Sequence, residues 1–307
     1  MEFLISTNFW ASVLASTTPV LLATLAANIM TKAGIFNLGI EGTMLMCALA
    51  GVLASAFSHS LLVGALVGVL LGIAVSFILG YFILKMNAPM NACGVAINLA
   101  ATGGTVFVMA MICGSKNNTT SLVSASFPAI DIPLLQDIPV LGEILSGQNL
   151  VTYLSWLFVA ATYFLLYHTK LGINIRAVGE NEAAARSAGI NVLGTKFVAL
   201  AMCGVFCAFG GMYLSMGAMR SFTAGMVSGR GFMSLAMDAI AQGNPLIGCA
   251  SSFLYGFSDT ITVYLQLYSN LDLKLISAFP YLFILVVLVI IQASRSWLQS
   301  RKQRSLT

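Results

Sequence analysis

The sequence predicts an all-α membrane protein, a polytopic helical bundle of about eight to ten transmembrane segments that forms one domain over residues 1–307. Three observations lead to this fold class. The 307 residues are 59% hydrophobic and only 8% charged, whereas a soluble domain usually carries about 25% charged residues. Apolar runs of about 20 residues, long enough to cross a bilayer, recur along the chain. Glycine, proline and asparagine interrupt several of these runs, which predicts broken or re-entrant helices.

The apolar runs predict eight full membrane segments and one shorter segment. The run at 231–243 is short for a full span, and the Gly-Asn-Pro sequence at its end predicts a half-helix that ends in a turn. Glycines recur every fourth residue in the third run, at Gly64, Gly68 and Gly72. This spacing allows close helix packing, within the chain or between subunits. The full segments cover about residues 9–30, 40–57, 61–84, 93–113, 150–168, 197–219, 246–268 and 276–294.

The distribution of basic residues predicts the orientation in the membrane. The tail 295–307 and the loop 169–196 each carry four Lys or Arg residues, so both are expected in the cytoplasm. The segment 114–149 has one lysine and three acidic residues, which predicts an external cap. Threading the chain back from these anchors places the N-terminus outside, and no cleaved signal peptide is expected. Arg220 and Arg230 fall on the predicted outside and count against this topology.

The sequence lacks the residue sets that most enzymes need. The stretch at 189–196 resembles a phosphate-binding loop, but its last two residues are in the wrong order. The two histidines, His59 and His168, have no acid or cysteine at catalytic spacing. Cys203 and Cys207 are one helical turn apart, either as a metal pair or as small packing residues. We therefore expect no catalysis and no metal or cofactor on this chain, and the scattered basic residues predict no nucleic-acid surface.

The stretch "KAGIFNLGIEGTM", residues 32–44, places Asn37 and Glu41 among three glycines in an apolar region. Polar groups inside a membrane are costly, so they usually face a cavity or a partner. The glycines favour a broken helix whose free backbone groups face a substrate route, as in many transporters. The alternative is that Lys32 and Glu41 lie near the cytoplasmic interface as an anchor or an ion pair.

Two further stretches have the same mixed character. In "NAPMNACGVAINLAATGGT", residues 87–105, Asn91 and Asn98 are seven residues apart and share a helix face. Their amides could bind a polar solute or another helix. Asp238 and Gln242 are four residues apart and share a face of the predicted half-helix. Together with the asparagine and glutamate of the first stretch, these four residues are our candidates for a translocation pathway.

The loop 169–196 contains a short predicted helix, "NEAAARSAG". Asn181 is a favourable N-cap, Glu182 suits the positive end of the helix dipole, and Gly189 can close the helix in a left-handed conformation. A helix this short is marginal in water and needs a surface to dock against. It is either a solvated amphipathic loop helix or a surface that a cytoplasmic partner grips.

Three motifs show a resemblance to a known family: "GIFNLGIEGTM", "GINIRAVGENEAAARSAGINV" and "GRGFMSLAMDAIAQGNPLIGCASSFLYGFSD". They resemble the permease subunits of bacterial ABC importers for ribose-type sugars and nucleosides, over about residues 18–292. "GENEAAARSAGI" looks like the coupling helix that sits in a groove of the ATPase subunit. "NLGIEG" is closest to the nucleoside-type branch, and "GVAINLAATGGTVF" resembles the shorter of the two permeases that such systems often encode.

The resemblance implies a channel-forming subunit in the bacterial cytoplasmic (inner) membrane. It would work with ATP-binding subunits that carry the ATP, with a second homologous permease or a second copy of itself, and with an external substrate-binding protein. ATP binding would draw the coupling helices together and switch access from outside to inside. The resemblance assigns the coupling surface to Glu180, Asn181, Glu182, Ala184, Arg186 and Gly189. It places Asn37, Glu41, Asn98 and Asp238 near the pathway.

The sequence departs from the family pattern before the Asn-Pro pair, where Gln242 and Gly243 replace an expected Lys-Trp. The departure leaves the substrate open among nucleosides, sugars and riboflavin-like molecules. An ion-coupled secondary transporter, with Glu41, Asp238 and Asp259 as coupling groups, is the first alternative, and the short capped helix argues against it. A membrane-embedded enzyme or complex subunit is the second alternative, and the lack of a nucleophile–base or metal set weakens it.

Overall fold

The structure is a computed structural model that describes residues 6–120, 122–131, 141–268 and 272–304, and nearly all of its regular structure is helical. Seven helical stretches in these residues are long and apolar enough to cross a membrane. They are α1 (Thr7–Lys32), α2 (Ile40–Ser58), α3 (Leu61–Leu84), α4 (Met90–Cys113), α7 (Leu150–His168), α10 (Val192–Met212) continued by the π-helical segment η2 (Tyr213–Ala218), and α13 (Leu273–Arg304).

The shorter elements complete the fold and confirm the all-α class. They are α6 (Leu141–Leu145), α8 (Lys170–Glu180), α9 (Glu182–Ser187), α11 (Arg230–Ala241), α12 (Pro245–Tyr268) and the two-residue strands β1 (Ala129–Ile130) and β2 (Gln148–Asn149), which pair in antiparallel register. Eight to ten transmembrane segments were expected. The difference from seven lies in α11, which is a half-helix as predicted, and in α12, which has the length of a span but carries many polar residues, among them Asp259.

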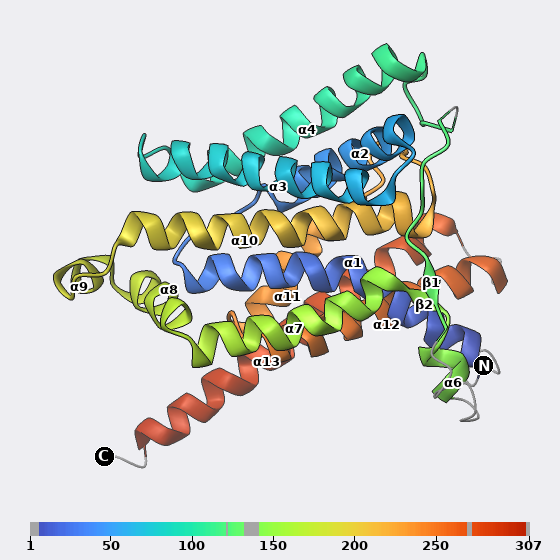
Figure 1. Cartoon of the computed structure of the whole chain (residues 1–307). Coiled ribbons are helices and arrows are strands. Elements are labelled where there is room, and N and C mark those ends of the chain that lie inside the picture. Colours follow the sequence, from blue (N-terminus) through green and yellow to red (C-terminus); the bar gives the residue numbers. More distant parts are fainter. Residues whose placement is uncertain (1–5, 121, 132–140, 269–271, 305–307) are drawn as a thin grey trace.

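Helix α1 lies in the middle of the bundle (Figure 1) and is almost entirely buried along its second half. Helices α2, α3 and α4 lie on one side of α1 and α10, and α7 lies on the other, with α12 and α13 behind. The glycines of α3 pack within this chain. A Cβ atom at Gly72 would collide with the carbonyl oxygen of Gly204 in α10, and one at Gly68 would collide with the Met212 sulfur. Packing within the chain was one of the two alternatives expected for this glycine series.

Two helices begin inside the bundle after a break. Residues 33–39 turn back along the end of α1, where the Ile35 amide donates to the Met30 carbonyl and Gly34 has a φ of 71°. Helix α2 starts only after this turn. Helix α11 starts after Gly229, which has a φ of 83°, and ends at Gln242, which has a φ of 51°. The broken helices predicted around 32–44 and 231–243 are therefore confirmed.

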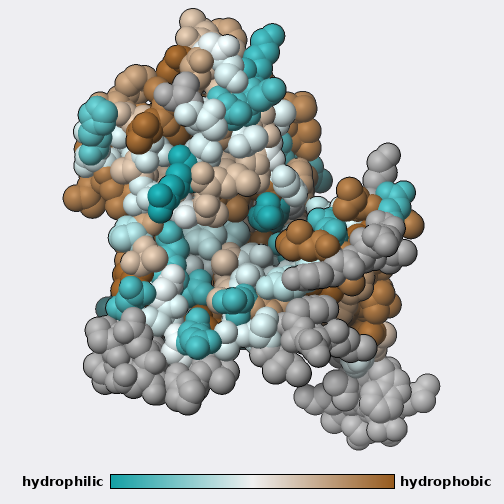
Figure 2. All heavy atoms as spheres, turned by 90° about the vertical axis from the view of Figure 1, so that its right-hand side faces the viewer, coloured by the Kyte–Doolittle hydropathy of each residue, from teal (hydrophilic) through white to brown (hydrophobic). Residues whose placement is uncertain are grey.

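The bundle has two different ends (Figure 1). One end carries α8, α9 and the C-terminus, and the opposite end carries β1, β2, α6 and the N-terminus. Residues 114–120 and 122–131 cross this second end, where Asn118 forms a β-bridge with Thr223. Hydrophilic and intermediate side chains cover much of its middle, and hydrophobic side chains gather at its margins (Figure 2). The loop 169–196 and the described parts of the segment 114–149 thus lie at opposite ends, as the orientation prediction requires.

Candidate functional site

The α8–α9 unit forms the end of the molecule that carries the predicted coupling surface. Helix α9 begins as predicted, because the Asn181 side chain accepts a hydrogen bond from the Ala184 amide at 3.0 Å. It closes at Gly189, which has a φ of 82°, with the Ile190 amide bonded to the Ala185 carbonyl at 3.0 Å. Helix α8 was not expected, because we took residues 170–180 for loop. Its Ile175 and Val178 side chains are buried, and this packing stabilises it.

Two contacts hold α9 against its own chain. The Ala185 side chain is buried in a small apolar cluster with Val178 of α8 and Val192 of α10. The Glu182 carboxylate forms a salt bridge with Lys196, whose side chain is almost fully buried. Lys196 is therefore a structural partner of α9, although the sequence suggested a loop cation. These contacts account for the stability of a six-residue helix that would be marginal alone.

The rest of α9 is open to solvent. Its outer face projects beyond α8 and α10 at the end of the bundle (Figure 1). Only Ala185 within α9 is buried, so the helix presents one continuous exposed face. The six residues predicted to form the coupling surface are all exposed: Glu180, Asn181, Glu182, Ala184, Arg186 and Gly189.

Helix α8 is joined tightly to the end of α1. A Cβ atom at Gly179 would collide with the Lys32 carbonyl oxygen and would lie 2.8 Å from the Gly34 nitrogen. Beside this contact lies a polar cavity of about 300 Å³ between the two helices, lined in part by Thr31 and Arg176. This close backbone approach fixes α8 against the end of α1, and α9 is packed against α8 in turn.

Glu41 holds the beginning of α11. Its two carboxylate oxygens accept hydrogen bonds from the Gly229 amide at 2.8 Å and from the Gly231 amide at 2.7 Å. A negative charge is favourable at the N-terminus of a helix, where backbone amides have no helical partner. The described residues include no salt bridge between Lys32 and Glu41, the ion pair considered above. Glu41 therefore joins the start of α2 to the start of α11.

Asp238 holds the other end of α11. Its carboxylate accepts a hydrogen bond from the Thr31 hydroxyl of α1 at 2.5 Å, and its second oxygen is buried without a hydrogen-bond partner among the described residues. Gln242 ends the helix in a left-handed conformation with its side chain exposed. Helix α11 is thus fixed at one end to α2 and at the other end to α1.

The asparagines hold the break before α2. Asn98 of α4 accepts a hydrogen bond from the Gly42 amide at 2.8 Å and donates to the Leu38 carbonyl at 2.9 Å. Asn37 accepts from the Gly39 amide and donates to the Cys203 sulfur at 3.4 Å. Asn91 is exposed in the first turn of α4. Of the two uses left open for Asn98, the structure shows the bond to another helical segment.

A polar cavity that our sequence analysis did not identify lies beside α11, α12 and α13. Its volume is about 430 Å³, and Arg230 and Asp259 face each other in its wall at 3.9 Å. None of the six pathway candidates is among its described lining residues. The signal was present in the sequence, because Tyr255, Asp259 and Gln266 follow helical spacing on one face of α12.

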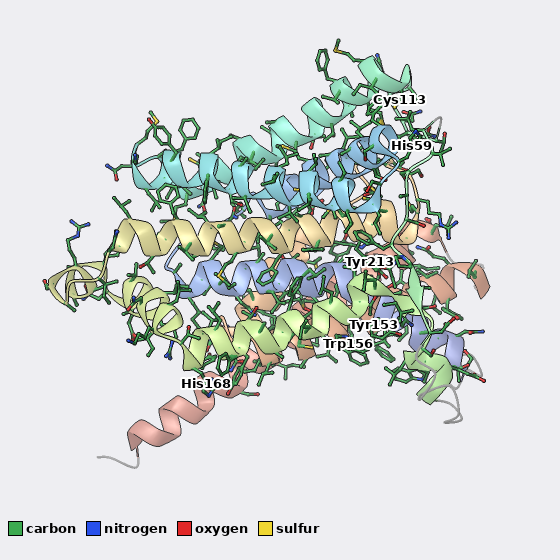
Figure 3. All side chains as sticks on the ribbon, in the orientation of Figure 1. His59, Cys113, Tyr153, Trp156, His168 and Tyr213 are labelled. Atoms are coloured by element: carbon green, nitrogen blue, oxygen red, sulfur yellow. The ribbon has the colours of Figure 1, made fainter. Side chains whose placement is uncertain are left out.

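Residues of the usual catalytic or metal-binding types are scattered. Within the described part of the chain, no group of three His, Cys, Asp or Glu side chains is placed to hold a metal ion. Cys203 and Cys207 are buried with their sulfurs 4.0 Å apart. His168 lies at the end of α7 beside α8, whereas His59 and Cys113 lie at the opposite end of the molecule (Figure 3).

Comparisons with known proteins agree with this architecture. A protein family described as "Branched-chain amino acid transport system / permease component" matches residues 9–292. The chain is 29% identical to the guanosine ABC transporter permease protein of Bacillus subtilis over 88% of this chain and 87% of that protein. It is 29% identical to the putative glucose ABC transporter permease protein of Haloferax volcanii over 80% and 73%. It is 26% identical to the nucleoside ABC transporter permease protein of Lactococcus lactis over 91% and 90%. No solved structure matches significantly.

Proposed function

Because this chain belongs to the permease family of the branched-chain amino acid transport type, it is the membrane-spanning subunit of an ABC importer, and we propose that it moves a nucleoside or a related polar solute. Two of the relatives described above are named for guanosine or nucleosides and one for glucose, which supports this substrate class. Sugars and riboflavin-like molecules are the other solutes that the motifs allow. Membership of this family excludes the ion-coupled secondary transporter, which was the first alternative.

Permeases of this family act with ATP-binding subunits and substrate-binding proteins, so the ATP is used by a partner. We propose a bacterial cytoplasmic membrane location, with the C-terminus and α9 in the cytoplasm. We also propose that this chain pairs with a second homologous permease, as the resemblance to the shorter of two encoded permeases implies. The substrate-binding protein would then dock at the end that carries residues 114–131.

The exposed face of α9 carries the proposal for coupling. Docking onto a nucleotide-binding partner needs a rigid, protruding surface, and α9 is fixed to the bundle by Ala185 and Lys196 while its other side chains stay exposed. A force on α9 would reach α1 through the Gly179 contact. It would then reach α11 through Thr31 and Asp238. This chain of contacts links the proposed ATPase contact to a broken helix inside the membrane.

Arg186 offers the sharpest test, because Glu182 also has a structural ion pair. The expected result for Arg186→Glu is at least about a tenfold loss of solute-stimulated ATP hydrolysis and transport, since a reversed charge opposes docking. The matched control is Lys85→Glu, which reverses an exposed charge after α3, at the same end of the bundle. Both variants would be purified with their ATP-binding subunit and assayed in proteoliposomes. Full coupling in Arg186→Glu would remove α9 from the ATPase contact.

A further inference from the structure

The polar cavity beside α12 lies in the half of the molecule nearest the end that carries β1 and β2. The N-terminal residues of α11, the second half of α12 and the first turns of α13 enclose it. Its volume of about 430 Å³ falls within the range of small-molecule sites, about 300–1,000 Å³. The lining includes Ser228, Arg230, Tyr255, Asp259, Gln266 and Tyr281.

Two charged side chains in a membrane-spanning bundle require an explanation, because such groups are costly unless they face a cavity or a partner. The Arg230 guanidinium and the Asp259 carboxylate are 3.9 Å apart, and their side chains are 25% and 19% exposed. Arg230 also donates to the Val227 carbonyl at 3.3 Å, while its Nε is buried without a hydrogen-bond partner in the described residues. At 3.9 Å the pair is too long for a direct hydrogen bond, and Ser16 of α1 also bonds the Asp259 carboxylate, so the two charged groups are held near each other without being locked together.

The walls around this pair suit a planar ring. Tyr255 of α12 is 3% exposed and Tyr281 of α13 is 47% exposed, so one phenol ring is fixed in the wall and the other stands at the opening. Gln266 and Ser277 add neutral polar groups, joined to each other by a hydrogen bond of 3.1 Å. By contrast, the cavities on the α2–α3–α4 side of the bundle have apolar linings, which suit lipid.

We propose that this cavity binds the imported solute at the end where it enters the permease, and that Arg230 and Asp259 recognise a nucleobase edge. A guanidinium donates to ring acceptors and a carboxylate accepts from ring N–H groups, so the pair complements an edge with neighbouring acceptors and donors. Aromatic side chains stack on bases of any kind. The pair has no net charge, so a neutral solute leaves it balanced. The inference rests on the proposed import function and narrows it to nucleosides.

The cavity is also linked through hydrogen bonds to the starts of α2 and α11, the two helices that begin inside the bundle. Arg230 stands between Gly229 and Gly231, whose amides are both held by the Glu41 carboxylate. A solute that binds the Arg230 side chain therefore also affects the position of the first turn of α11. Solute binding and the position of this half-helix are coupled through three consecutive residues.

The test is ATP-dependent uptake of radiolabelled guanosine, in competition with adenosine, cytidine and ribose, by the complete transporter in proteoliposomes. Asp259→Asn is expected to lower the rate of guanosine uptake about tenfold when guanosine is present at subsaturating concentrations, because a carboxylate hydrogen bond is lost. It is also expected to change the order of the competing nucleosides, which a purely structural role would not do. Asp131→Asn is the matched control, because it removes an exposed carboxylate beside β1, at the same end of the molecule.

Tyr281→Ala is the second variant, and its half-exposed position makes loss of folding a small risk. If Asp259→Asn does not assemble with the ATP-binding subunit, a raised KM for guanosine in Tyr281→Ala supports the site and an unchanged KM overturns it. An assembled Asp259→Asn transporter that loses all solutes equally, or none, also overturns it. A wild-type transporter that takes up ribose but no nucleoside would contradict recognition of a base edge and would leave the proposed import function intact. Absence of an ATP-binding subunit from the purified complex would instead contradict the proposed function.

Discussion

Glu41 shows how one ionisable residue is accommodated inside a membrane bundle. Its charge is met by two backbone amides at 2.8 and 2.7 Å. These amides belong to the first turn of a broken helix and have no helical acceptor. The carboxylate and the half-helix therefore satisfy each other's hydrogen-bonding groups. This interaction gives Glu41 a structural role, because it joins the start of α2 to the start of α11.

At the residue scale, we predict that Glu41→Gln lowers the free energy of unfolding by about 2 kcal/mol, since one charge-assisted hydrogen bond is lost. The NH₂ group of the amide would also face a backbone N–H. Thermal unfolding of the purified protein in detergent measures the effect. Glu143→Gln serves as the control, because Glu143 is an exposed residue of α6. Equal stability of the two variants would contradict the capping role.

The polar residues around the break before α2 were predictable as a group, but their hydrogen-bond partners were not. Asn37, Glu41 and Asn98 were identified because polar side chains are rare in apolar runs. Their hydrogen bonds join positions far apart in the chain, 56 residues apart for Asn98 and Gly42. Only the packing of α2, α4 and α11 brings such positions together. The same limit applies to Arg230 and Asp259, which we had interpreted separately.

At the scale of one element, α8 and α9 form for different reasons: local capping determines the ends of α9, and tertiary packing stabilises α8. The ends of α9 were predicted because capping depends on neighbouring residues, Asn181 at one end and Gly189 at the other. Helix α8 was missed because it contains Gly172 and Gly179, which disfavour a helix in isolation. Both glycines fit closely against other backbone, so tertiary packing overrides their weak propensity.

The Gly179 contact yields a second prediction. Gly179→Ala should destabilise the protein by about 1–3 kcal/mol, because the added methyl group would collide with the Lys32 carbonyl oxygen. Gly103→Ala in α4 is the control, since no atom lies within 4 Å of a Cβ built there. Thermal unfolding of both variants distinguishes the effects. A Gly179→Ala protein as stable as the control would show that α8 is not tightly joined to α1.

At the scale of the whole molecule, the two ends of the bundle predict its orientation. In a background in which the six cysteines are replaced, a membrane-impermeant maleimide added to intact bacterial cells should label Lys116→Cys, because residue 116 lies at the proposed external end. Arg186→Cys should stay unlabelled until the membrane is opened. Both positions are exposed in this chain, and expressing it without its ATP-binding subunit keeps Arg186→Cys accessible once the membrane is opened. The reverse labelling pattern would invert the topology.

Composition was enough to predict the membrane class and the positions of most helices, because hydrophobicity acts along the whole chain. It was not enough to count the spans. Helix α12 has the length of a span, yet serine and threonine residues and Asp259 lower its hydropathy. Such a helix is stable in the bundle because its polar face meets α1 and the cavity. For example, Ser252 bonds Thr24 at 3.0 Å. Pairing of this kind is a property of the assembled molecule.

The bond between Glu41 and the start of α11 also sets an order of events during biosynthesis. The Gly229 amide lies 188 residues further along the chain than Glu41. At about 5–20 residues per second, a ribosome needs roughly 10–40 s to add that stretch. During this interval α2 is already made and its carboxylate has no amide to meet. The nascent chain must hold Glu41 in water, or keep it protonated, until α11 emerges.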